Sequence, residues 1–310
     1  MKIRNLILYS FLLFSFWLDA QENRLNFKVN INHDISTDLE CFSYFVLPGD
    51  TITVFVETKQ DAELKIQYEK GNILEQDNRH FRYVTPEKKG YYELNIKDVK
   101  SGESMSLLVF VMVPASEIKN GYLNGYRIGI YPEENYKHKI SYQKPKGFIE
   151  VTEDNKDVFL TPHFQLKQFL CKEQGEWPKY VVIKPLMLKK LELLLDKLHG
   201  NGIKAKTLFL MSAYRTPYYN KAIGNVKYSR HQYGDAVDIY VDENLDGVID
   251  DLNGDGISTI KDAEVIQQLV EQLEAEPDNK DMIGGMGKYK KTSAHTYFIH
   301  IDTRGYRARW

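Results

Sequence analysis

Apolar and polar residues alternate with a period of two through most of the first third of the chain. The alternation is clear in residues 27–31, 52–56, 64–68 and 105–111, and short runs rich in Pro, Gly, Asp and Ser separate these segments. A period of two is typical of strands that bury one face, and short turn-rich connections favour antiparallel pairing. We therefore expect residues 21–115 to form an all-β sandwich of the immunoglobulin-like type.

The hydrophobic pattern changes to a helical period in the second half. Pro185 opens a segment with apolar residues at every third or fourth position, and Gly200 closes it as a C-terminal cap. A second amphipathic helix is predicted from Asp262 onward. Strands are predicted around residues 207–211, 236–241 and 297–302. This mixture predicts an α+β domain over residues 161–310.

Residues 116–160 lie between these two patterns and are rich in Tyr, Lys, Pro and Gly. Aromatic side chains rarely stay in water, so a flexible linker is not expected. We expect a connector that packs against the C-terminal domain. The total of 310 residues is enough for two ordinary domains.

The N-terminus has the pattern of a secretory signal. Lys2 and Arg4 precede an apolar run over residues 6–18, and Ala20 stands before a polar stretch. The run is shorter than the roughly 20 residues that a spanning helix needs, although a membrane anchor is the alternative. We expect residues 1–20 to be a cleaved signal peptide and the mature chain to be exported, periplasmic or extracellular, without a transmembrane segment.

Composition excludes some partners and leaves the redox state open. Charged residues make up 27% of the chain and the net charge is -2, so neither nucleic acid nor an anionic lipid surface is an expected partner. Cys41 and Cys171 are the two cysteines. Two buried thiols are the expectation, with a single bridge between them as the alternative in an oxidising compartment.

Two short segments, residues 229–238 and 298–304, combine metal-ligand residue types with a strand pattern. Alternation places Asp238 on the polar face of one strand and His300 on the polar face of another, while His231 approaches from the preceding loop. A catalytic zinc typically takes three His or carboxylate ligands and leaves a fourth position for water. These three residues form a candidate zinc site. Two histidines held by structural hydrogen bonds are the alternative.

Several segments resemble the D-alanyl-D-alanine metallopeptidase group, the peptidase M15 family, and in particular the C-terminal peptidase domains of its subfamily A. The resemblance covers about residues 160–310 and rests on segments 161–164, 212–217, 218–220, 229–238, 284–287 and 298–304. It implies the α+β zinc peptidase fold that this family shares with hedgehog domains and vancomycin-resistance D,D-dipeptidases. It also implies zinc ligation by His231, Asp238 and His300.

The resemblance gives Arg215 a role as well, in stabilising an oxyanion or holding a substrate carboxylate. A salt bridge that pins the turn at residues 212–220 is the alternative. Many relatives carry a base two or three residues before the last zinc ligand, whereas Phe298 and Tyr297 stand there. Asp302 is a candidate for the general base or for orienting a ligand, and His295 is the other candidate base.

A second ion site is suggested by residues 251–262. Oxygen ligands at loop positions 1, 3, 5, 7 and 12, with Gly256 at position 6, match a calcium loop. The candidate ligands are Asp251, Asn253, Asp255, Ile257 through its carbonyl, and Asp262. An Asp- and Gly-rich surface turn that caps the following helix is the alternative.

The resulting hypothesis is an exported zinc metallopeptidase that acts on peptidoglycan peptides. It would cut a stem-peptide or cross-link bond next to a D-amino acid, as a D,D-carboxypeptidase or a murein endopeptidase. A carboxypeptidase needs a cation for the terminal carboxylate, and Arg215, Arg230 and Arg304 are all available. The competing hypothesis is a non-catalytic cell-wall binding protein that retains the peptidase fold. The β-sandwich would be a positioning module or a structural appendage.

Overall fold

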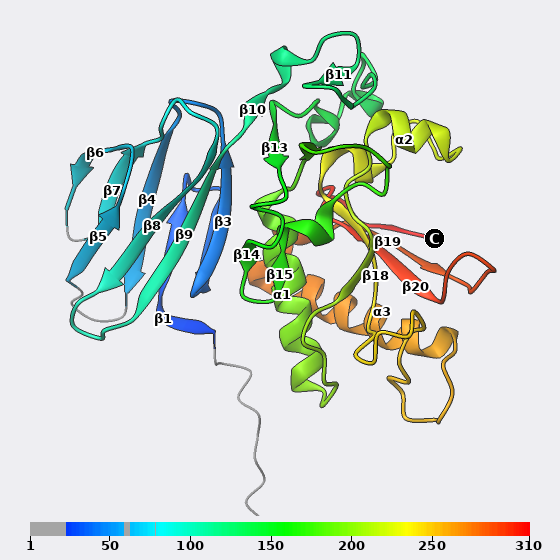
Figure 1. The fold of residues 1–310 in the computed structure, drawn as a ribbon. Helices are drawn as coiled ribbons and strands as arrows, with labels where there is room; N and C mark the ends of the chain where they lie inside the picture. Colours follow the sequence, from blue (N-terminus) through cyan, green and yellow to red (C-terminus); the bar gives the residue numbers. More distant parts are fainter. Residues whose placement is uncertain (1–22, 59–62, 78) are drawn as a thin grey trace, which may run out of the picture.

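The computed structural model describes residues 23–58, 63–77 and 79–310. The predicted signal peptide, residues 1–20, lies outside these described residues. Figure 1 shows an all-β region formed by the first third of the chain beside a region that combines a sheet with helices. None of the described helices has both the length and the apolar character needed to cross a membrane.

Two β-sheets make up the N-terminal region. One has five strands in the order β2 (Ile35–Leu39), β1 (Arg24–Ile31), β4 (Thr51–Thr58), β7 (His80–Val84) and β6 (Asn72–Gln76). The other has four strands in the order β3 (Cys41–Val46), β9 (Ser104–Val111), β8 (Gly90–Asp98) and β5 (Leu64–Tyr68). Both sheets contribute fully buried side chains to one core, for example Val54 and Val109. This region fits the predicted β-sandwich, whereas its immunoglobulin-like character stays a prediction.

Short elements in the connector, residues 116–160, and on both sides of it join the two regions. A three-stranded sheet runs in the order β10 (Val113–Pro114), β13 (Gly147–Val151) and β16 (Lys179–Val181). Two hairpins pair β11 (Tyr122–Leu123) with β12 (Tyr126–Arg127), and β14 (Phe159–Thr161) with β15 (Phe164–Gln165). The 3-10 helices η1 (Ala115–Glu117), η2 (Tyr136–His138) and η3 (Ile140–Tyr142) lie in this segment. Tyr131 anchors it, since its hydroxyl is 2.9 Å from the Tyr214 hydroxyl and donates to the Gln232 carbonyl at 3.0 Å.

The C-terminal region is built on a five-stranded sheet. Its strand order is β17 (Phe209–Ser212), β18 (Ala236–Tyr240), β20 (Phe298–Asp302), β19 (Gly285–Tyr289) and β21 (Ala308–Arg309). The helices are α1 (Pro185–Gly200), α2 (Pro217–Ala222) and α3 (Ile260–Ala275), with the 3-10 helices η4 (Leu166–Phe169), η5 (Arg230–Tyr233) and η6 (Pro277–Met282). Helices α1 and α3 pack together, and α3 contacts β19 and β20. The relation to the hedgehog-type fold stays a prediction.

A buried lysine fastens α1 to the end of strand β20. Lys190 is fully buried, and its Nζ donates to Glu274 Oε1 at 2.7 Å, to the Met282 carbonyl at 2.9 Å and to the Asp302 carbonyl at 3.0 Å. Burial lowers the pKa of this ammonium, while the Glu274 carboxylate opposes that shift. The charge is therefore fully partnered, as a buried charge requires. It fixes the strand on which His300 lies.

Ion pairs cross the boundary between the two regions. Arg24 of β1 pairs with Asp38 at 2.5 Å and also with Asp196 of α1. His163 Nδ1 lies 2.7 Å from Glu192 Oε2 of α1, and its Nε2 lies 3.4 Å from Asn23 Nδ2, next to strand β1 of the sandwich. His163, part of the segment 161–164 that resembles the peptidase family, thus lies at this boundary.

The two cysteines do not pair. Cys171 is buried and Cys41 is partly buried, and both are free thiols. The bridge that the sequence left open is absent, and burial of both thiols raises their pKa values. Packing and ion pairs therefore hold the two regions together without this covalent link.

Candidate metal centre

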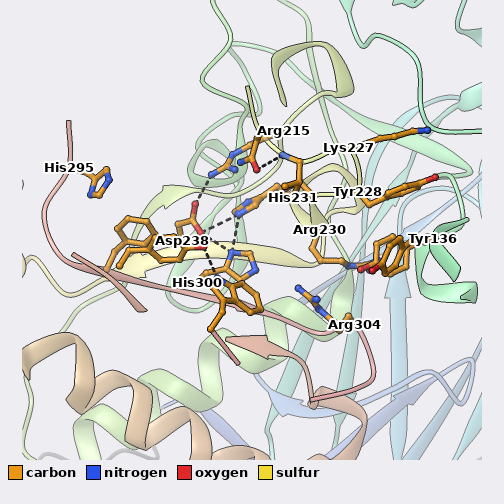
Figure 2. A pocket seen from close by; sticks show the side chains of 17 residues that line it. Tyr136, Arg215, Lys227, Tyr228, Arg230, His231, Asp238, His295, His300 and Arg304 are labelled. Atoms are coloured by element: carbon orange, nitrogen blue, oxygen red, sulfur yellow. Dashed lines mark hydrogen bonds and ion pairs between the residues drawn. The ribbon is translucent and has the colours of Figure 1, made fainter. Parts of the chain in front are cut away.

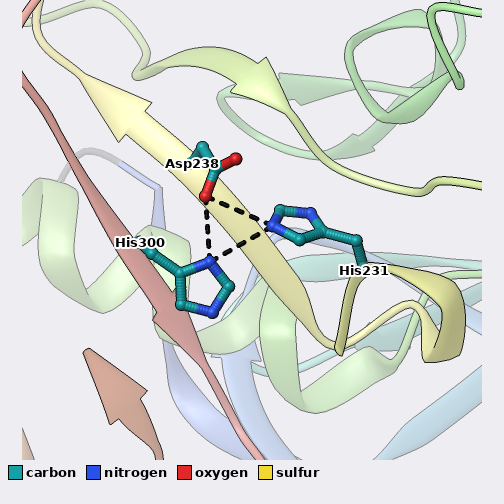
Figure 3. Close-up of side chains that lie close together, drawn as sticks. All are labelled: His231, Asp238 and His300. Carbon is teal, nitrogen blue, oxygen red and sulfur yellow. Dashed lines mark hydrogen bonds and ion pairs between the residues drawn. The ribbon is translucent and has the colours of Figure 1, made fainter. Parts of the chain in front are cut away.

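His231, Asp238 and His300 converge at one point, as Figure 3 shows. His231 Nε2 and His300 Nδ1 lie 3.2 Å apart, and Asp238 Oδ1 lies 3.2 Å from the first and 2.9 Å from the second. All three residues are buried, and their ligand atoms lie within 4.8 Å of one another. Asp238 of β18 stands directly opposite His300 of β20 in the antiparallel ladder, which explains why two residues 62 positions apart meet.

His231 is oriented by a backbone carbonyl. Its Nδ1 donates to the Ala213 carbonyl over 2.6 Å. Since a carbonyl oxygen only accepts, this bond places the proton on Nδ1 and leaves the lone pair of the neutral ring on Nε2, which faces the cluster. Burial lowers the pKa of His231, against the opposing effect of Asp238, and so favours this neutral form.

Arg215 bonds the carboxylate oxygen of Asp238 that does not contact the two histidines. Arg215 Nη2 donates to Asp238 Oδ2 at 2.5 Å, and Arg215 Nε donates to the Ser212 hydroxyl at 2.8 Å. The other carboxylate oxygen, Oδ1, faces both imidazoles. Burial opposes ionisation, but the two histidines outweigh it and hold the pKa of Asp238 well below its usual value. The carboxylate is therefore anionic and directed at the cluster.

His300 is held from behind by Asp302. His300 Nε2 lies 3.2 Å from Asp302 Oδ2, which leaves Nδ1 on the cluster side. Burial disfavours protonation of His300, but its hydrogen bonds to Asp238 and Asp302 raise its pKa to about 9. Each of the three residues thus has one atom that faces the cluster and another that bonds a protein group outside it. Metal ligands in proteins typically have such outer hydrogen-bond partners.

Asp302 is itself fully buried and bound on several sides. Arg304 Nε donates to both carboxylate oxygens of Asp302, at 2.9 Å for Oδ1 and 2.8 Å for Oδ2. Oδ1 also accepts from the Gly285 amide at 2.7 Å. A Cβ on Gly284 would come within 1.8 Å of the Asp302 carbonyl oxygen, so only glycine permits this close approach. Of the two roles left open for Asp302, this placement favours orienting His300 over accepting a proton from the pocket.

The cluster lies in a cavity of about 560 Å³, shown in Figure 2. The Tyr136 and Tyr142 side chains of the connector form part of its wall. Sequence patterns assigned these residues no part in the site, and the aromatic richness of the connector was the one signal for them. The cavity is lined by Tyr136, Tyr142, Arg215, Asn225, Val226, Lys227, Tyr228, Ser229, Arg230, His231, Asp238, Tyr289, His295, Phe298, His300, Arg304 and Trp310.

His295 lies in the loop before β20 and lines the same cavity. Its Nδ1 donates to the Thr296 carbonyl at 2.8 Å, and its ring packs edge-on against Phe298 with centroids 4.9 Å apart. Because the carbonyl accepts a hydrogen bond from Nδ1–H, the neutral form of the ring has its lone pair on Nε2. A catalytic role for His295 stays a prediction, supported by its place in the cavity lining.

The suggested calcium loop is organised by its own backbone. Asp251 Oδ1 accepts from the Gly254 amide at 2.8 Å, and Asp251 Oδ2 accepts from the Gly256 amide at 2.7 Å. Asp262, fully buried, accepts from the Leu252 amide at 2.8 Å and the Thr259 amide at 2.6 Å. Among the described residues, the group of three that comes within metal-binding range is the His-Asp-His cluster. Calcium binding by Asp251, Asn253, Asp255, Ile257 and Asp262 therefore lacks support.

Two imidazoles and a carboxylate that converge on a cavity are a donor set typical of metal-dependent hydrolases. Residues 162–253 match the family model described as Peptidase M15, which supports the assignment to the peptidase M15 family. The matched segment contains Arg215, His231 and Asp238 and ends before His300, so the place of His300 in the cluster rests on the geometry. A peptidase, and hence a hydrolase, is the activity that this family assignment supports.

The other comparisons add little. No curated protein matches the chain. One solved structure, described as a DUF4784 family protein from Bacteroides caccae ATCC 43185, is 16% identical, with 29% of this chain and 24% of that chain covered and a TM-score of 0.17. The match thus spans about a quarter of that protein. At this TM-score it carries no argument about fold or function.

Proposed function

We propose that the chain is an exported zinc-dependent peptidase that hydrolyses peptidoglycan stem-peptide or cross-link bonds next to a D-amino acid. The observation that carries the proposal is the convergence of His231, Asp238 and His300, each fixed from behind, in a cavity large enough for a peptide segment. The peptidase M15 match supports the class of reaction. The signal-like pattern in residues 1–20 supports export.

The donor set fits zinc. His231 Nε2, Asp238 Oδ1 and His300 Nδ1 would hold the ion, and the hydrogen bonds behind them fix which atom each one offers. When bound, zinc supplies Lewis-acid activation of water and of the scissile carbonyl. Three His or carboxylate ligands are the number that a catalytic zinc site typically takes from the protein, whereas structural sites usually take four.

Other side chains of the cavity position the substrate and move protons. Arg215 lies beside Asp238 with its side chain 11% exposed, where its charge can stabilise a carbonyl oxygen as negative charge develops. His295, with its Nε2 lone pair, is the proposed group that accepts the proton of the attacking water and passes it to the leaving amine. Asp302 keeps His300 in place from outside the cavity.

One observation favours a second candidate, a cell-wall binding protein that retains the fold. Asp238 is the one carboxylate side chain among the described residues that line the cavity, and it belongs to the proposed ligand set. The base that many relatives carry, a His two residues or a Glu three residues before the last ligand, is missing here, since Phe298 and Tyr297 stand at these positions. If His295 does not serve as the base, the centre would bind wall peptides without cutting them.

Mass spectrometry of purified peptidoglycan incubated with the mature chain distinguishes the two candidates. We expect new muropeptides with the zinc-loaded chain, and none after chelation or with His231→Ala. The matched control is His33→Asn, which changes an exposed histidine of the sandwich and should leave cleavage unchanged. The masses of the products identify the bond. Intact muropeptides from a folded, zinc-loaded chain would favour the binding protein.

A further inference from the structure

The cavity around the cluster is unevenly charged. Arg215, Lys227, Arg230 and Arg304 line it, whereas Asp238 is the one carboxylate side chain that the described part of the chain contributes to the lining. Arg215, Arg230 and Arg304 are each paired with a carboxylate, and Asp238 is the one of these three carboxylates that lines the cavity, so the side chains that face the cavity are mainly cationic. Figure 2 shows that Lys227, Arg230 and Arg304 lie on the side of the cluster away from His295. One arm of the cavity is therefore cationic, and the other carries His295 with the stacked rings of Tyr289 and Phe298.

Arg230 has a donor that the fold does not use. Its Nε donates to Asp235 Oδ1 at 3.1 Å, and its Nη2 also bonds the Asp235 carboxylate. The guanidinium lies over the ring of Tyr142, with Cζ 4.2 Å from the centroid. Nη1 is buried and has no hydrogen-bond partner among the described residues. Solvent cannot readily supply one, because the side chain is only 2% exposed. Buried donors in proteins are nearly always satisfied, and because Arg230 lines the cavity, an acceptor that enters the cavity would satisfy this one.

Arg304 lies close to Arg230 on the same arm. Both guanidinium charges act on the Tyr142 phenol, where they oppose the rise in pKa that burial causes. The Arg304 side chain is 13% exposed, compared with 2% for Arg230, so an entering anion meets Arg304 first. The partner carboxylates, Asp302 and Asp235, are buried and do not line the cavity. Two buried ion pairs thus direct their cationic ends toward the same space.

We propose that Arg230 and Arg304 form a subsite for a carboxylate of the substrate on one side of the scissile bond. This subsite rests on the proposed peptidase function. It adds that a carboxylate of the bound peptide lies on the Arg230 and Arg304 side of the cavity. A carboxylate has two acceptor oxygens in a plane, which match the guanidinium donors. Low solvent access strengthens the contact. The carboxylate could be the terminal one of the peptide or that of an acidic residue within it.

The test removes the Arg230 charge without leaving its buried partner unpaired. The variant Arg230→Gln with Asp235→Asn replaces an ion pair by two amides, since loss of one member alone would leave an uncompensated charge. The matched control is Arg82→Gln with Glu75→Gln, an exposed ion pair of the sandwich at 3.0 Å. Arg230→Lys is a second variant, which keeps the charge and loses the planar fork. Arg304 is left intact because it holds Asp302.

Two pairs of synthetic peptides serve as probes. One is diacetyl-L-Lys-D-Ala-D-Ala with a free or an amidated C-terminus, and the other is L-Ala-γ-D-Glu-L-Lys-D-Ala-D-Ala with the glutamyl α-carboxylate free or amidated. Binding to the zinc-loaded chain is measured by calorimetry, and hydrolysis by mass spectrometry. The pair in which amidation weakens binding identifies the source of the carboxylate.

We expect the wild type and the control variant to bind the free acid of one pair about 10- to 100-fold more tightly than its amide, the range for a hydrogen bond to a charged group. The Arg230 variants should lose most of this preference and keep their zinc. Equal binding of acid and amide by the wild type, or a preference that survives in both Arg230 variants, would overturn the subsite. Acid-selective binding without hydrolysis would instead overturn only the peptidase function.

Discussion

Two clusters of ligand-type residues in the C-terminal region differ in where their oxygen and nitrogen atoms point. In the His231, Asp238 and His300 cluster the ligand atoms face one another, and protein groups hold each residue from the other side. In the loop at residues 251–262, Asp251 and Asp262 accept hydrogen bonds from amides of the loop itself. Both clusters have the residue types and the spacing of an ion site.

The difference lies in the backbone that carries the side chains. Strands β18 and β20 fix the directions of Asp238 and His300, and the residues beside them are buried and cannot turn back on the chain. Short Asp and Asn side chains in a turn can instead bond the nearby backbone. Spacing alone therefore predicts an ion site less well than spacing on a rigid element with partners behind it.

The largest expected effect is on zinc affinity. His231→Ala removes one of three ligands, so we expect a loss beyond the roughly 100-fold that outer partners of a ligand contribute. Asp251→Ala, the matched change in the loop, should leave zinc affinity unchanged. Titration against a competing chelator measures both. Equal losses in the two variants would contradict the distinction between the clusters.

Asp302→Asn tests whether the groups behind the ligands matter. We expect zinc affinity to fall by about 10- to 100-fold, because the amide no longer fixes His300 in the same way. Asp255→Asn in the loop is the control. If zinc affinity were retained while hydrolysis disappeared, Asp302 would take part in proton transfer rather than orientation.

Asp262→Ala tests the role of the loop. Asp262 and Thr259 form a capping box at the start of α3, so we expect the free energy of unfolding to fall by about 1–2 kcal/mol. The loss should be the same with chelator and with calcium, measured by urea denaturation. Asp278→Ala, an exposed acid near the start of η6, is the control. A calcium-dependent rise in the stability of the wild type would support an ion in the loop.

A smaller effect is expected at the boundary of the two regions. The hydrogen bond to Glu192 raises the pKa of His163 above its usual value of 6.5, although burial opposes this shift. Its protonated form therefore stabilises the fold below about pH 6.5, and this contribution is lost as pH rises through the raised pKa. The stability difference between wild type and His163→Gln should shrink from about pH 5.5 to about pH 8.5 in urea titrations. A difference that grows with pH would contradict this assignment.

Periodicity predicted the main elements of the fold and not their pairing. The apolar stripe from Met187 to Leu198 lies in α1, because one face of that helix is buried. Strand β6 escaped prediction, since four of its five residues are exposed and no alternation marks it. Helix α3 begins at Ile260 rather than Asp262 because Thr259 caps it. The parallel pairing of β3 with β9 depends on contacts far apart in the sequence, which no local pattern contains.

The candidate site was likewise predicted only in part. Strand alternation and the family resemblance brought out His231, Asp238 and His300, and the structure brings these residues together. The opposition of Asp238 and His300 across two strands could not be read from spacing. Tyr142 was missed because it comes from the connector, where the sequence shows aromatic character but no direction. The unsatisfied Nη1 of Arg230 is visible only once its neighbours are placed.

The most direct test of the central claim is X-ray absorption spectroscopy of the zinc-loaded chain. We expect one zinc per chain with nitrogen and oxygen ligands only, two of them imidazoles at about 2.0–2.1 Å, and loss of this signal in His231→Ala and His300→Ala. A sulfur ligand from Cys171 or Cys41, or an unchanged spectrum in both histidine variants, would show that zinc binds elsewhere.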